Sequence, residues 1–405
     1  MPPSGKGTGN KNYMVMKTIK GLFITVSAMM ALTGCVKEEV TETYADMLNE
    51  NRIYEEYKEQ KEANVMTAPV NTGTMFAVKE QVNAEEVEGF MPIAMRQHNV
   101  GKRGMKIVIM PEGFSCEEEE DVRLYRERAE QVADYIFSIE PMASLRERFD
   151  VYCLPLNDVT QDCVNVQVSG DRLKTDVFSV MGVMSKTLTV AATGQGVRTV
   201  ETVPFYNGGS YVGEINVESI ESVAVVLSLN RQGARARTFM EGTDFCASII
   251  PVSRDAADPH LERCVQHEVC GHGVGLLADE YDSDGRKHEN VFDEAKRLDE
   301  QHRVGMYLNA DVHEDPELTP WRDFIGLEGY EDEGIGTYEG ACGSYSMGVY
   351  RPTENSIMRD SHHVSEFNAP CRWFIFKRIM EQTEGYADFK TFLSMDAGQK
   401  ERRKR

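Results

Sequence analysis

Apolar runs along the chain mark the strands that the sequence predicts. The segment MKIVIMPEGF, residues 105–114, predicts a buried strand that ends in a turn at its Pro-Glu-Gly sequence. Three later runs predict further strands: FDVYCLPLN at 149–157, SVAVVLSLN at 222–230 and CASIIPVS at 246–253. The segment TMFAVKEQV, residues 74–82, is a candidate strand as well.

Segments with helical spacing separate these strands and set the fold class. The segment SCEEEEDVRLYRERAEQVADYIFSI predicts a helix with Ser115 as its N-cap and the acidic run Glu117–Glu120 at the positive end of the helix dipole. A second helix is predicted over HLERCVQ, residues 260–266. Residues 160–220 are predicted to be β-rich and irregular. Strands separated by helices are typical of an α/β fold, which is the class we expect.

The N-terminal residues predict export and lipid attachment. Lys17 and Lys20 precede an apolar run, GLFITVSAMMALTG, that ends directly at Cys35. This run is too short to span a membrane comfortably, and the Leu-Thr-Gly-Cys sequence at its end resembles the lipobox of bacterial lipoproteins, whose cysteine is acylated. We therefore expect a chain anchored through Cys35 in the outer membrane, facing the periplasm or the cell surface.

Changes in composition predict four parts of the chain. They are a signal with upstream residues at 1–34, a charged tether and small N-terminal segment at 35–99, one large domain at 100–390, and a basic tail at 391–405 whose end, AGQKERRKR, is expected to be frayed. The formal net charge of −22 argues against nucleic acid as a partner, because proteins that bind it normally present a basic face.

Export would place the eight cysteines after Cys35 in a compartment that permits disulfides. Proximity in the sequence makes two pairs plausible, Cys153 with Cys163 and Cys342 with Cys371. No Cys-x-x-Cys spacing occurs, so a cysteine zinc site has little support.

The segment QHEVCGHGVGLLADEY holds the candidate chemistry. His267 and Glu268 form a His-Glu pair typical of zinc peptidases, but His272 follows five residues after the first histidine rather than four. On a regular α-helix, residues five apart are separated by about 140° around the axis, against about 40° for residues four apart. We therefore predict a π-bulge between Val269 and His272, with Gly271 tolerating the distortion.

A catalytic zinc site usually takes three protein ligands and keeps one position open for water. The glycines after His272 are expected to end the helix, and the chain then presents two acids, Asp279 and Glu280. We favour Asp279 over Glu280 as the third ligand. Glu268 would deprotonate the water for attack on a carbonyl and pass the proton to the leaving amine.

HEVCGHGVGLLADEY resembles the active-site segment of the IgA-cleaving metallopeptidase family, which is grouped with the metzincins. NSIMRD, residues 355–360, resembles a Met-turn, which would place Met358 beneath the metal. GTYEGACGSYSMGVYRPTENSIM and FNAPCRWFIFKRI are similar to later segments of the family, whereas Pro-Glu-Gly-Phe at 111–114 departs from the Gly-Asp-Gly-Tyr that its members often have. The resemblance covers about residues 100–385.

The resemblance implies a metzincin-like zinc peptidase domain over residues 100–390, with a twisted mixed sheet, an active-site helix and a Met-turn. It implies one Zn²⁺ per chain and a zinc-dependent endopeptidase that hydrolyses peptide bonds of extracellular or host proteins. Tyr345, Tyr350 and Arg351 lie near the Met-turn in the sequence and are candidate contacts for the oxyanion or the substrate.

The sequence after the Met-turn departs from some metzincins, which carry a tyrosine there. This chain has Asp360 and then His362 and His363, and the two histidines are the main rivals of Asp279 as third ligand. Other functions also stay open. A non-catalytic binding lipoprotein would close its metal with four protein ligands, and a zinc amidase acting on cell-wall peptides would use the same zinc and base. A calcium-binding adhesin is the weakest alternative, because the sequence has no calcium-loop spacing.

Overall fold

The computed structural model describes residues that all fall within one compact unit of the chain, Asn71–Arg405. The described residues are 88–97, 104–164, 166–169, 172–175, 177–194, 200–207, 210–229, 235–238, 245–254, 259–282, 291–343 and 345–403. The lipobox, Cys35 and the candidate strand at 74–82 lie outside them. In this part of the chain, no helix combines the length and the apolar character that crossing a membrane requires.

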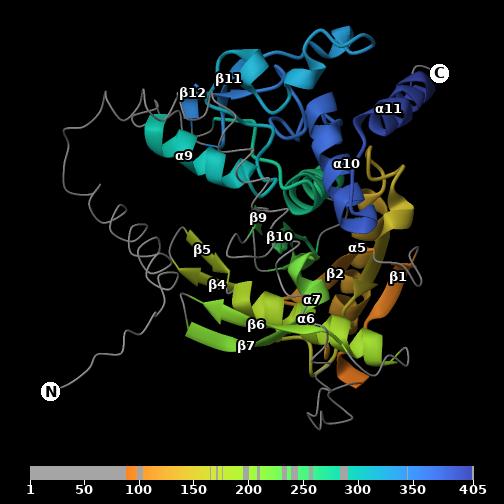
Figure 1. Cartoon of the computed structure of the whole chain (residues 1–405). Coiled ribbons are helices and arrows are strands. Elements are labelled where there is room, and N and C mark those ends of the chain that lie inside the picture. Colours follow the sequence, from red (N-terminus) through yellow and green to blue (C-terminus); the bar gives the residue numbers. More distant parts are fainter. Residues whose placement is uncertain are drawn as a thin grey trace, which may run out of the picture. The chain divides into compact units, whose positions relative to one another are not determined.

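A six-stranded mixed sheet forms the centre of the fold (Figure 1). Its strands, in spatial order, are β1 (Ile93–Gln97), β3 (Phe149–Cys153), β2 (Met105–Glu112), β8 (Val223–Ser228), β10 (Cys246–Pro251) and β9 (Arg235–Thr238). The four central strands are parallel, and the two edge strands are antiparallel to their neighbours. The four apolar runs that predicted strands are these four parallel strands, so the α/β prediction is confirmed.

The parallel strands are buried on both faces, which explains why they are apolar without alternation. Successive side chains of β2 nevertheless enter different cores, because side chains alternate across a strand. Ile107 and Ile109 pack with the helices that carry the site, whereas Val108 and Met110 pack with Val180 on the opposite face.

Helices and small hairpins surround the sheet. The helices are α5 (Glu119–Ile136), α6 (Val177–Gly194), α7 (Val217–Ile220), α8 (Leu261–Val265), the π-helix η2 (Gln266–Val274), α9 (Val291–His302), α10 (Ala369–Glu384) and α11 (Phe389–Arg403). Short 3-10 turns are η1 (Arg146–Arg148), η3 (Pro316–Leu318), η4 (Arg322–Phe324) and η5 (Glu331–Glu333). The hairpins are β4 (Val166–Ser169) with β5 (Arg172–Thr175), β6 (Thr202–Asn207) with β7 (Ser210–Asn216), and β11 (Tyr338–Ala341) with β12 (Tyr345–Arg351). Leu298 of α9 belongs to the same small core as Ala341 of β11 and Val349 of β12. Figure 1 shows α9 beside this hairpin.

Two predictions for the first half of the chain need correction. Helix α5 begins at Glu119, with Glu118 at the N-cap position, so Ser115 is not the N-cap. The Ser115 hydroxyl instead accepts a hydrogen bond from the Glu117 amide in the preceding turn. Residues 160–220 do contain two hairpins, but the 18-residue helix α6 lies between them, so the β-rich prediction is only partly right.

The C-terminal residues pack as a helix. Phe392 and Asp396 are buried, and helix α11 continues to Arg403, so residues 397–403 of the end that was predicted to be frayed are helical. The buried Arg372 of α10 donates from Nε to Asp396 over 2.7 Å and from Nη2 to Glu333 over 2.7 Å. This charged network ties α10, α11 and the segment before β11 into one block.

None of the eight cysteines of the described residues forms a disulfide. The two disulfides predicted from sequence proximity, Cys153 with Cys163 and Cys342 with Cys371, are therefore wrong. Cys153 contacts the Tyr125 hydroxyl at 3.2 Å, and Cys371 lies 3.1 Å from a carboxylate oxygen of Glu280. Both thiols occupy positions in buried polar contacts rather than in cross-links.

Candidate metal centre

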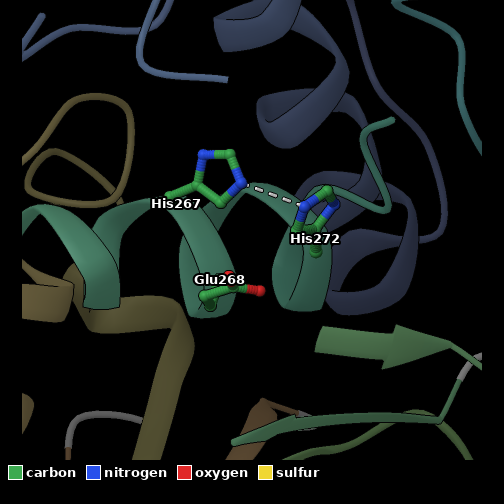
Figure 2. Close-up of side chains that lie close together, drawn as sticks. All are labelled: His267, Glu268 and His272. Atoms are coloured by element: carbon green, nitrogen blue, oxygen red, sulfur yellow. Dashed lines mark hydrogen bonds between the residues drawn. The ribbon is translucent and has the colours of Figure 1, made fainter. Parts of the chain in front are cut away.

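The two histidines of the motif lie on a π-helix. Element η2 spans Gln266–Val274, and its wide turn carries His267 and His272 on the same side (Figure 2). The wide turn is maintained to the end of the helix, where the Gly275 amide donates to the Cys270 carbonyl, five residues earlier. The predicted widening of the helix is confirmed, and it extends over a longer stretch than the single bulge between Val269 and His272.

One side-chain atom from each of His267, His272 and Asp279 lies beside this helix, close to the other two. The Nε2 atoms of His267 and His272 are 3.2 Å apart. Oδ1 of Asp279 lies 3.1 Å from the first of these nitrogens and 3.0 Å from the second. The three atoms therefore form a nearly equilateral triangle, with one atom from each residue.

Hydrogen bonds at the far side of each ring fix the tautomers. Nδ1 of His267 donates to the main-chain oxygen of Ile357 over 2.9 Å, and Nδ1 of His272 donates to that of Leu277 over 2.6 Å. A carbonyl oxygen can only accept, so each Nδ1 carries a proton, and each ring in its neutral form turns an Nε2 lone pair to the centre. This second contact of each ring is the arrangement that metal-binding histidines use.

The donor set fits a small divalent cation. Two imidazole lone pairs and a carboxylate oxygen would repel one another at these distances unless a positive charge lay between them. In a tetrahedral zinc site with metal–ligand bonds of about 2.0–2.1 Å, neighbouring ligand atoms lie roughly 3.3–3.4 Å apart. The sides of the triangle are 3.0–3.2 Å, close to that spacing.

The electrostatics of the cluster also favour positive charge. Burial acts to lower the pKa of His272, but the adjacent Asp279 carboxylate outweighs it and raises that pKa to about 9. Burial favours the neutral acid at Asp279, yet the two imidazoles hold the pKa of its carboxyl far below the usual range. The geometry and the charges of the cluster therefore call for a cation at the same point.

Glu268 belongs to the same group but stands apart from the triangle. One carboxylate oxygen and one nitrogen of each imidazole all lie within 4.8 Å of one another, and Figure 2 shows the carboxylate below the two rings. No hydrogen bond or ion pair joins this carboxylate to either ring, whereas Asp279 contacts both. The Glu268 main chain is fixed from the sheet, because Ser248 of β10 donates to its carbonyl over 2.9 Å.

Close packing holds η2 in place. A Cβ atom on Gly271 would overlap Sδ of Met358 and lie 3.0 Å from its Cε, so only glycine lets the methionine approach the helix this closely. Gly273 faces Val223 at the start of β8 in a similar way, with 3.0 Å available. The turn after the helix is made by Leu276, whose φ of 49° is left-handed, and not by a glycine.

The turn at 355–360 supports the centre from below. The Met358 side chain is fully buried beneath η2, its amide donates to the Ser356 hydroxyl over 3.1 Å, and its carbonyl accepts from the Glu280 amide over 2.9 Å. The carbonyl before it, that of Ile357, orients His267. None of these contacts could be derived from the spacing of the sequence, and only the resemblance to a Met-turn indicated them.

The other candidate ligands lie elsewhere. The Glu280 carboxylate is buried and accepts hydrogen bonds from Asn309, Ser356 and Asn368. His363 is exposed and bonds Asp360 of its own turn, and the ring of His362 packs against that of His260, with centroids 4.8 Å apart. Among these candidates, only Asp279 has an oxygen beside both imidazoles.

The predicted substrate contacts are placed less favourably. Arg351 is buried, and its Nη1 donates to the carbonyls of Glu339 and Gly340 over 2.6 Å each, so its guanidinium braces β11. Tyr350 exchanges main-chain bonds with Asp311, and Tyr345 packs against the small core beside α9. The structure adds a residue that the sequence did not single out: the Tyr281 ring is nearly parallel to that of His267, with centroids 6.4 Å apart.

Comparison with known proteins gives one family match. Residues 327–379 match the family model described as IgA Peptidase M64. The matched segment includes β11, β12, Met358 and most of α10, and it excludes η2 with its histidines. The comparison with curated proteins gives no match. The match and the independent His-Glu-His group on η2 together indicate a zinc peptidase.

Proposed function

We propose that the protein is a zinc-dependent endopeptidase with a metzincin-like domain. The observation that carries the proposal is the convergence of two Nε2 lone pairs and one carboxylate oxygen, with a second carboxylate, Glu268, near them but outside the triangle. Three ligands and a separate acid are the donor set of a hydrolytic zinc site that keeps a position open for water.

His267, His272 and Asp279 would hold the zinc. Zn²⁺, when bound, acidifies a water molecule and polarises the carbonyl of the scissile bond. The carbonyls of Ile357 and Leu277 keep both imidazoles in the tautomer that can bind a metal. Asp279 supplies negative charge, and its main-chain oxygen is held by the Cys342 amide over 2.8 Å.

Glu268 would serve as the general base. Among the described residues nothing donates to its carboxylate, so its oxygens are available to take a proton from the attacking water. The same carboxyl group would then give that proton to the leaving amine. Its position outside the ligand triangle suits a group that acts through a water molecule rather than on the metal.

Met358 supports the centre without taking part in the chemistry. It fills the space under Gly271, and its turn presents the Ile357 carbonyl to His267. This arrangement agrees with a Met-turn, and the family match over residues 327–379 includes the turn.

We also propose a location and a substrate class for the protein. Lipid attachment at Cys35 would place the catalytic domain outside the cytoplasm, in the periplasm or at the cell surface, where extracellular or host proteins are available as substrates. The support is the lipobox-like Leu-Thr-Gly-Cys sequence, which follows an apolar run and two lysines.

Metal analysis with a matched pair of variants tests the proposed activity. We expect one zinc per chain and hydrolysis of a peptide library that stops with a chelator and returns with zinc. Glu268→Gln should lower kcat by about 10²–10⁴-fold, as expected for loss of a general base, while zinc stays bound. Glu262→Gln, on the helix just before η2, is the control and should retain activity. Full activity of Glu268→Gln would refute the mechanism, and peptide hydrolysis without any metal would refute the proposal.

A further inference from the structure

Glu280, the acid next to Asp279, is fully buried in a polar network of its own. Oε1 accepts hydrogen bonds from Nδ2 of Asn309 over 3.0 Å, from Nδ2 of Asn368 over 3.2 Å and from Sγ of Cys371 over 3.1 Å. Oε2 accepts from the Ser356 hydroxyl over 2.5 Å and again from Asn368 over 3.2 Å. Every partner is a neutral donor, so both oxygens act only as acceptors.

These donors come from three separate segments that surround the metal centre. Asn309 lies in the loop after α9, Ser356 begins the turn with Met358, and Asn368 is the N-cap of α10. Asn368 also accepts from the Cys371 amide over 2.9 Å, which places Cys371 in the first turn of the same helix. Glu280 is thus the point at which these segments meet.

One branch of the network fixes the main chain that carries Asp279. Asn309 accepts from the Ala278 amide over 2.7 Å and donates to the Ala278 carbonyl over 2.9 Å, in addition to its bond to Glu280. The residues on both sides of Asp279 are therefore held by the same asparagine. This leaves Asp279 little freedom to move away from the imidazoles.

The other branch fixes the turn that orients His267. The Ser356 hydroxyl bonds both the Glu280 carboxylate and the Met358 amide, and the Glu280 amide bonds the Met358 carbonyl. Ile357, between those two residues, provides the carbonyl for Nδ1 of His267. The Glu280 carboxylate therefore braces the predicted ligand Asp279. It also braces the Ile357 carbonyl, which sets the tautomer of His267, another predicted ligand.

A charge on the buried Glu280 carboxylate requires compensation from its surroundings. A buried carboxylate is costly unless it is paired or satisfied by hydrogen bonds, and the hydrogen bonds to Glu280 come from neutral groups. Arg351 is a cation close enough to interact, but its Nη1 protons are used on the carbonyls of β11. A divalent cation bound beside Asp279 would supply positive charge near this carboxylate.

We propose that Glu280 is a positioning residue that sets the metal affinity of the centre, by locking Asp279 and the Ile357 carbonyl in their metal-binding positions. This inference rests on the proposed zinc site. Residues of this kind, one contact removed from the metal, typically change metal affinity or activity by 10–100-fold when they are altered.

Zinc affinity of the purified full chain, measured by competition with a chromophoric chelator, tests the role. Glu280→Gln has the same shape as the wild-type side chain. In either orientation of the amide, however, its NH₂ group faces donors that meet a carboxylate oxygen in the wild type. We expect its Kd for zinc to rise by about 10–100-fold. Ser356→Ala, which removes one donor and leaves the carboxylate in place, should give a smaller rise in Kd.

Asp396→Asn is the matched control. It neutralises another buried, hydrogen-bonded carboxylate, in the network of Arg372 between α10 and α11, so it should lower the melting temperature without changing the Kd for zinc. An unchanged Kd in Glu280→Gln would overturn the inference. If that variant does not fold, an unchanged Kd in Ser356→Ala would do so. Failure of the wild-type chain to bind zinc would instead refute the zinc site itself.

Discussion

The main-chain oxygen of Ile357 lies 2.9 Å from Nδ1 of His267, although the two residues are 90 positions apart in the sequence. This bond makes the turn at 355–360 part of the candidate metal centre, because it decides which ring nitrogen faces Asp279. The same turn inserts Met358 beneath Gly271 of η2. The position of the helix and the tautomer of its first histidine therefore depend on one short segment.

The contact between Gly271 and Met358 can be tested by a double-mutant cycle. Gly271→Ala places a Cβ atom where Met358 Sδ now lies, so we expect a loss of about 1–3 kcal/mol in stability and a lower zinc content. Met358→Ala creates a cavity and is also destabilising, by about 2–5 kcal/mol. The double variant should be more stable than the sum of the two changes predicts, because the overlap is then absent.

Gly182 provides the control for this cycle. It is exposed to solvent and lies away from the ends of α6, and a Cβ atom there would meet nothing within 4 Å. Gly182→Ala should therefore stabilise the protein by about 0.5–1 kcal/mol, since alanine favours a helix more than glycine does. Denaturant unfolding of the wild type and the four variants measures each value, and strictly additive effects at Gly271 and Met358 would contradict the proposed contact.

The sequence predicted those parts of the fold that depend on apolar runs and on the spacing of nearby residues. The apolar runs gave the four parallel strands because strands covered on both faces have no polar side. The five-residue spacing of His267 and His272 predicted a widened helix for a geometric reason that needs no tertiary contact. Helix α6 was missed because its segment VFSVMGVMSKTLTVAATG is rich in valine and threonine, which favour strands, and burial against the sheet outweighs that preference.

The support of the metal centre was not predictable in the same way. Glu280 and Asp279 are adjacent acids, and nothing in their order shows that one faces the imidazoles while the other is buried under four donors. Gly271 was expected to ease a distorted backbone, but the structure shows that it makes space for Met358. The contacts of Glu280 with its donors and of Gly271 with Met358 join residues that are 29 to 91 positions apart, so only the folded chain reveals them.

Metal removal should lower the thermal stability of the protein. Zinc at about 1,000 times its Kd would stabilise the folded state by about 4 kcal/mol, because it binds the folded chain and not the unfolded one. A chelator should abolish that increment, and zinc should restore it in a calorimetric scan. His272→Ala should remove the response, whereas His362→Ala and His363→Ala should keep it, since both rings lie in contacts away from the triangle. A lost response in either control would make that histidine a ligand.

The buried network at the C-terminus should dominate the stability of its block. Asp396→Ala would leave the buried Arg372 guanidinium without its main partner, and we expect a loss of about 3–5 kcal/mol. Tyr330→Phe removes one hydroxyl donor to Asp396 and should cost about 1 kcal/mol. The exposed pair Arg123–Glu127 on α5 is the comparison, and Glu127→Ala should change stability by less than about 0.5 kcal/mol. Equal effects of the three changes in urea unfolding would contradict this ranking.

Histidine 313 should make stability depend on pH in a defined direction. His313 Nδ1 lies 2.6 Å from Asp311, and this hydrogen bond raises the pKa of His313, although partial burial opposes the rise. The charge of Asp315 raises this pKa further. Nδ1 of His302 lies 4.0 Å from the other carboxylate oxygen of Asp311. The folded state therefore binds the proton more tightly than the unfolded chain, whose histidine has a pKa of about 6.5. The contribution is fully present below about pH 6.5 and is lost as the pH rises through the folded value. Urea unfolding of wild type and His313→Asn should give a stability difference that shrinks as the pH rises; a difference that stays constant would show that the pair is not linked to protonation.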